Sequence, residues 1–506
     1  MAEPITRTAA DLKIVDSGAF YASDNVEGAL QEAGGGGGPA LYTTVVTTPA
    51  ELLTALTTPS GDTFITPGHY LIDITGISAG PLDTTPRRFV GAGREADGTG
   101  PYGGNGVTIE LTAGGGSSEL DFGASLTEVD GVEWENVQFV SSAPIVGPAL
   151  LAGCLSVKNV RMNGLSTVAQ GLRSCKNVVN CNFSNGGPGS VGFLSCDNVM
   201  NCTVGDPTPG SGAESGFIAC LSVVNGKVFY EPGGIGAFLD AFAFCDRLVN
   251  CLVDATPVAS VAAGTFRAAR LCDEVVNFTA LGPAGGPVGS MNGIESCERI
   301  SNCFVANFDI NYTTNVGMTD CESVQGTGVG SGQHFIFCER LKGCHVDGTG
   351  DDPAGVDGFE NCGQVSDCRA ENTTGHGFDG GSIFTNCRAT SPAAAFSGFN
   401  ACFDLSVCRT FGGTTGYQTC EGLSSCRADS AGTDGFNGCG KLSACHAENC
   451  VGDGYDACVM VSACLATLNT GFGYRDCSEI SSSQSNANTA GTDTGSVNKS
   501  AASNNF

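Results

Sequence analysis

The chain has 506 residues, of which 75 are glycine and 27 are cysteine, and its formal net charge is −29. Hydrophobic residues make up 41% of the chain, too many for a disordered acidic polymer. The negative charge would repel phosphate backbones and anionic lipid headgroups, so nucleic acid is not expected as a partner. No apolar run reaches about 18 residues, so we expect no membrane insertion.

Residues 1–38 form the first predicted segment, a short helix followed by a glycine linker. Ser23 or Asp24 can cap the helix, and Val26, Leu30 and Ala33 share one face. A helix of this length is marginal alone and needs a partner. Residues 1–10 lack the basic-then-apolar pattern of a secretory signal, so we expect folding in a cytoplasm, where cysteines remain thiols.

Residues 39–98 are predicted to form an N-terminal cap and the first coils of a repetitive fold. Residues 47–56 have the pattern of a short amphipathic capping helix, with Pro49 near its first turn. A cap is expected because the open end of a stack of β coils is an exposed sheet edge.

One cysteine recurs from residue 154 onward, at intervals of 21 to 27 residues that shorten to 18 to 21 after Cys362, with one interval of 17. Gly381 takes its place in one repeat, which gives sixteen repeats. The members of this first cysteine column are Cys154, Cys175, Cys196, Cys220, Cys245, Cys272, Cys297, Cys321, Cys338, Cys362, Cys402, Cys420, Cys439, Cys458 and Cys477.

Three other columns keep the same register. An aliphatic or aromatic residue lies three positions after each first-column cysteine, an aromatic residue often lies three positions before it, and a second cysteine often lies six positions after it. Coils of about 20 residues, stacked about 4.8 Å apart, would turn each inward column into a ladder of like side chains. The fold predicted for residues 99–480 is therefore an all-β solenoid, and residues 481–506 are either a last polar coil or a loose tail.

An asparagine column is the most specific feature of the repeat. It lies five positions after the first cysteine, is preceded by Asn136 and Asn105, and fades from Gly326 onward. Asparagine tolerates the left-handed conformation, and its amide can bond to the amide of the next coil. Its seven successive members are Asn159, Asn180, Asn201, Asn225, Asn250, Asn277 and Asn302.

This pattern resembles the asparagine ladder of the pectate-lyase-like superfamily. The resemblance implies a right-handed, single-stranded parallel β-helix, and the start of the chain is similar to the capping helix and first coils of that superfamily. The calcium-binding and basic catalytic residues of the pectate lyases are not recognisable in this sequence.

The segment from Asp24 to Glu32 resembles a segment near the N-terminus of bacteriophage tail-fibre, head-fibre and other appendage proteins. The resemblance implies attachment to other virion proteins through residues 1–38, with Asn25, Val26 and Leu30 as attachment residues. It also implies a homotrimer located in the virion.

No cofactor or metal site is expected. The Cys-x5-Cys spacing matches no common zinc site, the five histidines are scattered, and the thiols are expected to be buried as small hydrophobes. Cys450 falls outside both cysteine columns and is the predicted exposed thiol.

The sequence favours a structural virion appendage, a phage fibre or spike that contacts host glycans, over an enzyme, and no catalytic residue is assigned. The first alternative is a tailspike-type polysaccharide depolymerase, a hydrolase or lyase that would need paired carboxylates. Its candidate acids, also readable as solvated loop residues, are Asp206, Glu214, Glu231 and Asp240. The second alternative is a bacterial β-helical adhesin.

Overall fold

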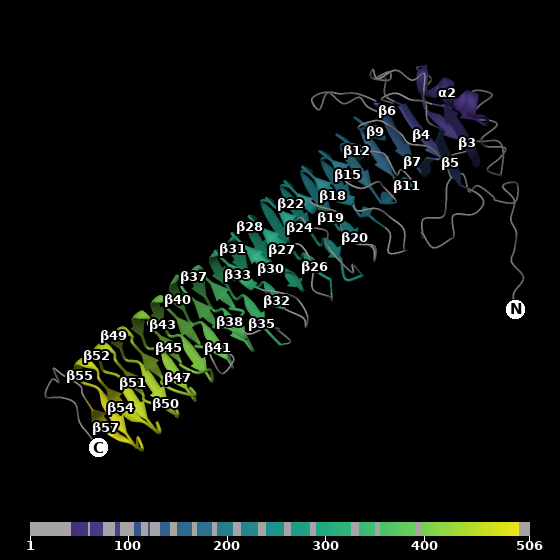
Figure 1. Cartoon of the computed structure of the whole chain (residues 1–506). Helices are drawn as coiled ribbons and strands as arrows, with labels where there is room; N and C mark the ends of the chain where they lie inside the picture. Colours follow the sequence, from purple (N-terminus) through teal and green to yellow (C-terminus); the bar gives the residue numbers. More distant parts are fainter. Residues whose placement is uncertain are drawn as a thin grey trace, which may run out of the picture. The chain divides into compact units, whose positions relative to one another are not determined.

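The computed structural model describes residues 42–58, 61–73, 87–91, 106–112, 120–121, 132–141, 149–163, 170–184, 190–205, 214–230, 239–257, 265–283, 290–324, 333–349, 355–390 and 396–494. The chain divides into two compact units, residues 1–203 and residues 204–506. Both are built from coils of a right-handed parallel β-helix, as the sequence predicts (Figure 1).

In both units a coil contributes to three parallel sheets. We call them sheet 1, which follows the first cysteine column, sheet 2, which follows the second, and sheet 3, which precedes the first.

In the first unit, sheet 1 contains β1 (Thr44–Val46), β2 (Thr63–Ile65), β4 (Arg87–Gly91), β7 (Val132–Glu135), β10 (Ser156–Lys158), β13 (Asn177–Val179) and β16 (Asn198–Met200). Sheet 2 contains β3 (Gly68–Asp73), β5 (Val107–Thr112), β8 (Val137–Ser141), β11 (Arg161–Asn163) and β14 (Asn182–Ser184). Sheet 3 contains β6 (Leu120–Asp121), β9 (Leu151–Ala152), β12 (Gln170–Arg173) and β15 (Ser190–Leu194). The strand β17 (Thr203–Val204) belongs to sheet 2 and includes the last residue of the first unit and the first residue of the second.

In the second unit, sheet 1 contains β19 (Ser222–Val224), β22 (Arg247–Val249), β25 (Glu274–Val276), β28 (Glu298–Ser301), β31 (Val316–Thr319), β34 (Glu339–Lys342), β37 (Gly363–Ser366), β40 (Ser382–Thr385), β43 (Phe403–Ser406), β46 (Glu421–Ser424), β49 (Gly440–Ser443), β52 (Val459–Ser462) and β55 (Ser478–Ser481). Sheet 2 contains β20 (Lys227–Phe229), β23 (Leu252–Asp254), β26 (Thr279–Leu281), β29 (Phe304–Ala306), β32 (Glu322–Val324), β35 (His345–Asp347), β38 (Arg369–Glu371), β41 (Arg388–Thr390), β44 (Arg409–Phe411), β47 (Arg427–Asp429), β50 (His446–Glu448), β53 (Leu465–Thr467) and β56 (Gln484–Asn486). Sheet 3 contains β18 (Glu214–Ile218), β21 (Leu239–Ala243), β24 (Thr265–Arg270), β27 (Ser290–Glu295), β30 (Ile310–Thr313), β33 (Gln333–Ile336), β36 (Phe359–Glu360), β39 (Phe378–Asp379), β42 (Phe399–Asn400), β45 (Tyr417–Gln418), β48 (Phe436–Asn437), β51 (Tyr455–Asp456), β54 (Phe472–Arg475) and β57 (Gly491–Thr494).

The predicted capping helix is α2 (Pro49–Thr57) in the first unit. A capping box begins it, because the Thr48 side chain accepts a hydrogen bond from the Glu51 N–H while the Glu51 carboxylate accepts one from the Thr48 N–H. The helix buries its apolar face, and a side chain from a neighbouring strand forms hydrogen bonds with its last turn.

The residue that forms these hydrogen bonds is Arg87 on β4, and its side chain is buried. Its guanidinium donates to three carbonyl oxygens at the end of α2, those of Ala55, Leu56 and Thr58, at 2.8 to 3.0 Å. These carbonyls have no partner within the helix, so the buried guanidinium satisfies their hydrogen-bonding capacity. Its positive charge also interacts favourably with the negative end of the helix dipole.

The core of the second unit is made of ladders of like side chains. An aromatic ladder on sheet 3 stacks successive rings with centroids 4.5 to 5.1 Å apart. Its tyrosines fit among phenylalanines because each hydroxyl donates to a backbone carbonyl, as Tyr417 does to Cys408 at 2.7 Å. The ladder consists of Tyr312, Phe335, Phe359, Phe378, Phe399, Tyr417, Phe436, Tyr455 and Tyr474.

Strand register corrects the assignment of Cys321. Ile300 pairs with Met318, and Phe304 pairs with Glu322, so Cys321 stacks in the second cysteine column and not in the first. The first-column place in this coil belongs to Asn315, which is buried and accepts a hydrogen bond from the Cys297 N–H at 2.9 Å. The interval of 17 residues therefore joined cysteines of two different columns. The asparagine column likewise continues at Asp320, not at Gly326, which lies outside the described residues.

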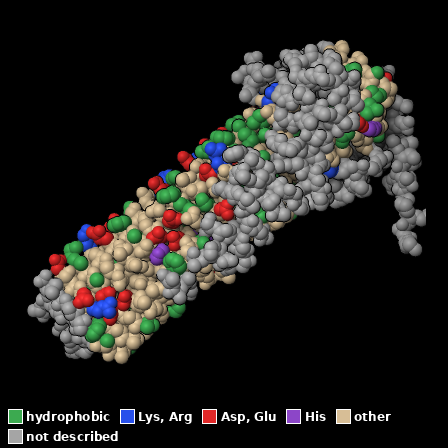
Figure 2. All heavy atoms as spheres, in the orientation of Figure 1, with side chains coloured by type: hydrophobic (Ala, Val, Ile, Leu, Met, Phe, Trp, Pro, Cys, Tyr) green, Lys and Arg blue, Asp and Glu red, His purple; other side chains and the backbone are tan. Residues whose placement is uncertain are grey.

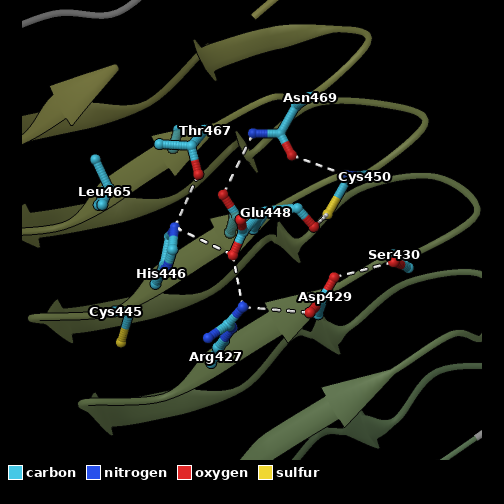
Figure 3. A network of polar contacts seen from close by, with 12 residues as sticks. Arg427, Asp429, Ser430, Cys445, His446, Glu448, Cys450, Leu465, Thr467 and Asn469 are labelled. Atoms are coloured by element: carbon cyan, nitrogen blue, oxygen red, sulfur yellow. Dashed lines mark hydrogen bonds and ion pairs between the residues drawn. The ribbon is translucent and has the colours of Figure 1, made fainter. Parts of the chain in front are cut away.

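All 27 cysteines are free and buried, and this corrects the prediction that Cys450 is exposed. Cys450 is 1% exposed, and its N–H donates to Asn469 Oδ1 at 2.9 Å (Figure 3). It occupies an inward-pointing corner after sheet 2, where a thiol fills space as a small hydrophobe. Burial raises the pKa of its thiol to about 12, which suppresses the reactive thiolate.

The asparagine column lies at the corner between sheets 1 and 2. In the first unit Asn180 donates to Asn159 at 3.0 Å and accepts from Asn201 at 3.1 Å, and in the second unit Asn277 donates to Asn250 at 3.0 Å. Every described residue of the column is left-handed, with φ near +50° to +60°. Asn105 lies outside the described residues.

Replacement of Asn180 tests two contributions of this column to stability: the hydrogen bonds of its side-chain amides and its tolerance of the left-handed backbone. Asn180→Ala should lower the free energy of unfolding by about 1–2 kcal/mol, because alanine loses both amide bonds and is strained at φ +54°. Asn180→Gly keeps the backbone unstrained and should lose only about half as much. Denaturant unfolding of both variants measures the difference, and equal losses would contradict a backbone contribution.

Candidate functional site: the polar face of sheet 3

Two outward columns of sheet 3 carry most of the buried charge of the second unit. They lie five and two residues before the first cysteine column, and strand register pairs Asp240 with Arg267 in one and Glu360 with Asp379 in the other. Figure 2 shows charged side chains gathered in small groups against a largely uncharged surface. Three such groups lie on these columns.

The first group is centred on Arg267 of β24. Its guanidinium lies between two carboxylates, 3.4 Å from Asp240 Oδ1 and within hydrogen-bonding distance of Glu295. Burial raises the pKa of Asp240, and the two arginines Arg267 and Arg270 oppose that rise. Asp240 is therefore a carboxylate held in an ion-pair network.

The other acids predicted near this region cannot be placed. Asp206 and Glu231 lie outside the described residues, as does the side chain of Glu214. The attachment residues Asn25, Val26 and Leu30 also lie outside them.

The second group consists of Asp357, Glu360 and Asp379. Among the described residues none of these carboxylates forms an ion pair; amides hold two of them instead. Gln333 Nε2 donates to Glu360 at 3.0 Å, and Asn400 Nδ2 donates to Asp379 at 2.7 Å. The negative charges of this group are thus left without a nearby cation.

Burial and the neighbouring carboxylates change the acidity of the group. Burial raises the pKa of Asp357 from its ordinary 3.8 to about 7; the backbone N–H of His376, 2.6 Å away, opposes the rise, and the Asp379 and Glu360 carboxylates add to it. Burial also raises the pKa of Glu360, with Asp379 contributing. A carboxyl that titrates near neutral pH beside other carboxylates can exchange protons, which is the property of a general acid.

His376 completes this group from the next coil. Burial lowers the pKa of its imidazole, and its Nδ1 accepts a hydrogen bond from the Ser397 N–H at 3.0 Å. Its ring packs edge-on against Phe396 with centroids 5.2 Å apart. The ring is therefore held in place by a backbone contact and an aromatic contact.

The third group is an ion-pair cluster on the last coils. Arg475 donates to both oxygens of Asp456 at 2.8 Å and lies 2.9 Å from Asp453. This bidentate geometry neutralises the acids as Arg267 does in the first group. The group of Asp357, Glu360 and Asp379 thus differs from the two other groups on this face, because each of those contains an arginine.

Two features are absent from the part of the chain that the structure describes. No group of three or more histidine, cysteine or acidic side chains there is placed to hold a metal ion. None of the helices in that part has the length and apolar character needed to span a bilayer.

Comparison with known proteins gives weak similarity to solved structures. No family model and no curated protein matches the chain. Among solved structures it is similar to the A-module of mannuronan C-5 epimerase AlgE6 of Azotobacter vinelandii, with 10% identity, 90% of this chain and 96% of that chain covered, and a TM-score of 0.18. It is also similar to the catalytic unit of a GH87 α-1,3-glucanase of Streptomyces thermodiastaticus (12% identity, 92% and 70% covered, TM-score 0.18) and to tailspike protein 3 of bacteriophage CBA120 (11% identity, 90% and 59% covered, TM-score 0.17). At these identities and TM-scores the matches carry no information on activity.

Sequence reasoning missed the Asp357 group because its members come from two coils. The only signal in the sequence is position, since Glu360 and Asp379 both lie two residues before a first-column place, at Cys362 and Gly381.

The Asp357→Asn variant should change how stability depends on pH. The folded carboxyl binds its proton more tightly than the unfolded one, so its contribution is fully present below about pH 4 and is lost as the pH rises through about 7. Over this range the wild-type chain should lose about 1–2 kcal/mol more unfolding free energy than the variant, allowing for solvent screening.

Denaturant unfolding across that pH range provides the measurement. Asp404→Asn is the matched control, because Asp404 is an exposed acid on sheet 1 and asparagine tolerates its positive φ. Parallel pH curves for the wild type and Asp357→Asn would show that Asp357 titrates normally.

Proposed function

We propose that this chain is a structural appendage of a bacteriophage particle, a fibre or spike in which residues 1–38 attach to other virion proteins and the β-helix projects from the particle. The observation that carries the proposal is the segment from Asp24 to Glu32, which is similar to the N-terminal segment of phage appendage proteins. By the same analogy the appendage is a homotrimer, made in the host cytoplasm and located in the virion.

The β-helix has properties that suit such a role. Its coils are joined by backbone hydrogen bonds in three sheets, and its corners are left-handed in coil after coil. Its thiols are all buried, so they are protected when a particle leaves the reducing cytoplasm. These features support a durable shaft.

Substitution within the attachment segment tests the proposal. The triple variant Asn25→Ala, Val26→Ala, Leu30→Ala should fold normally, because the β-helix coils begin after the glycine linker, but should be absent from purified particles. Gln31→Ala is the matched control, since Gln31 lies off the predicted apolar face and should leave incorporation unchanged.

Immunoblotting of purified particles measures incorporation, and circular dichroism checks the fold. Particles that carry the triple variant at the wild-type level would show that this segment is not the anchor.

A second candidate function is polysaccharide cleavage at the Asp357 group. The observation that favours it is a carboxyl with a pKa of about 7 beside two others, with Glu360 and Asp379 paired across adjacent coils. Adjacent coils are about 4.8 Å apart, close to the separation of about 5 Å that retaining glycosidases use.

Release of reducing ends from host surface polysaccharide decides between the two candidates. An enzyme should lose this activity in Asp357→Asn and keep it in Asp404→Asn. A wild-type chain that releases no reducing ends has no such activity.

A further inference from the structure

A column of basic residues runs along the outward face of sheet 2 in the second unit. One basic side chain occupies the same register position in six successive coils of a chain whose net charge is −29. Like charges placed directly opposite each other across paired strands destabilise a sheet, so the column needs counter-charge. Its members are His345, Arg369, Arg388, Arg409, Arg427 and His446.

The outer arginines have that counter-charge within the chain. Arg369 lies 3.2 Å from Glu371. Arg427 lies 2.6 Å from Glu448 and 3.3 Å from Asp429, in the network that Figure 3 shows. Their acids stand in the neighbouring outward column of the same sheet.

The two central arginines do not. At the equivalent positions of that neighbouring column their coils carry Thr390 and Phe411. Arg388 Nε donates to Thr390 Oγ1 at 3.0 Å, and the guanidinium of Arg409 forms no hydrogen bond or ion pair with any described residue. Both arginines are exposed, so two coils present adjacent guanidiniums without a carboxylate.

Phe411 stands beside them on the same face. It is 47% exposed, and because Thr410 between it and Arg409 is buried, Phe411 and Arg409 both point outward. The equivalent residues of the coils on either side are Thr390 and Asp429, so the fold does not require an aromatic side chain there.

We propose that Arg388, Arg409 and Phe411 form a binding subsite for a carboxylate-bearing polysaccharide. The planar guanidinium matches a carboxylate in two parallel hydrogen bonds, and repetition about every 4.8 Å along the column lets neighbouring arginines bind one acidic group or successive groups. Phe411 packs against the apolar face of a sugar ring, and Thr390 adds a hydroxyl at the edge.

The overall charge selects among polyanions. The acidic chain repels a polyphosphate and an acidic polysaccharide alike, but only the polysaccharide also gains a ring contact with Phe411. The biological role rests on the proposed function, since a projecting appendage is what would meet a surface polysaccharide. The binding itself is measured on the isolated full chain, so its failure and a failure of virion incorporation are distinguishable.

Calorimetric titration with three probes tests the subsite: a short oligogalacturonate, the same oligosaccharide with its carboxylates methyl-esterified, and inorganic polyphosphate. The wild type should bind the free acid and bind the ester at least about tenfold more weakly, the loss of a charge-assisted contact. Polyphosphate should also bind more weakly than the free acid.

Variants locate the site. Arg388→Gln and Arg409→Gln should each weaken oligogalacturonate binding about tenfold, whereas Arg340→Gln, an exposed arginine on sheet 1, should leave it unchanged. Phe411→Ala should weaken binding of the oligosaccharide and leave any polyphosphate binding unchanged. Circular dichroism of each variant confirms the fold.

Three results would overturn the proposal: equal binding of the ester and the free acid, equal loss in Arg340→Gln, or tighter binding of polyphosphate that is insensitive to Phe411→Ala. The last result would describe charge capture without sugar recognition.

Discussion

This fold depends on one constraint: each residue is stacked on the equivalent residue of the next coil. Sheet after sheet pairs like position with like position, so each side chain must tolerate a near copy of itself about 4.8 Å away. Inside, thiols and aromatic rings meet this condition, because thiols are small and rings stack. Outside, like charges repel each other, which agrees with a chain in which only 15% of residues are charged.

The same constraint explains the corners. Asparagine suits the left-handed corner between sheets 1 and 2, since its amide both donates and accepts along the stack. Later coils place Val407, Ala444 and Ala463 at this corner with φ of 52° to 58°, although each pays about 1–2 kcal/mol for that conformation. The N–H of each of these residues donates to a carbonyl of the next coil, at 2.9 to 3.0 Å. Backbone pairing therefore imposes the corner, and asparagine only relieves its strain.

The repeating columns of the sequence predict the fold, but they do not show which column an individual residue occupies or which residues of different coils come together. The period predicts the β-helix, because stacking and burial select the same residue types in every coil, and the amphipathic pattern of residues 47–56 predicts the capping helix. It misplaces Cys321, since cysteine serves in two columns and only the pairing of Ile300 with Met318 distinguishes them. It misjudges Cys450 because a third inward corner, where Ala431 and Asn469 stand in neighbouring coils, carries no constant residue type. It cannot assemble the Asp357 group, because the acidity of those carboxyls depends on their burial and on carboxylates from the neighbouring coil.

In the outward columns of sheets 2 and 3, the repulsion between like charges on neighbouring coils is relieved in two ways. In several coils the answer is a counter-ion within the chain, as Arg475 is for Asp456 and Glu448 is for Arg427. In the Asp357 group a proton can neutralise a carboxylate instead, because burial, with the Asp379 and Glu360 carboxylates adding to it, raises the pKa of Asp357 to about 7. A guanidinium has no such recourse, because it keeps its proton at any pH at which a protein folds. Stacked arginines without carboxylates can be neutralised only from outside the chain. The Arg388 and Arg409 coils are therefore a place for an anionic ligand.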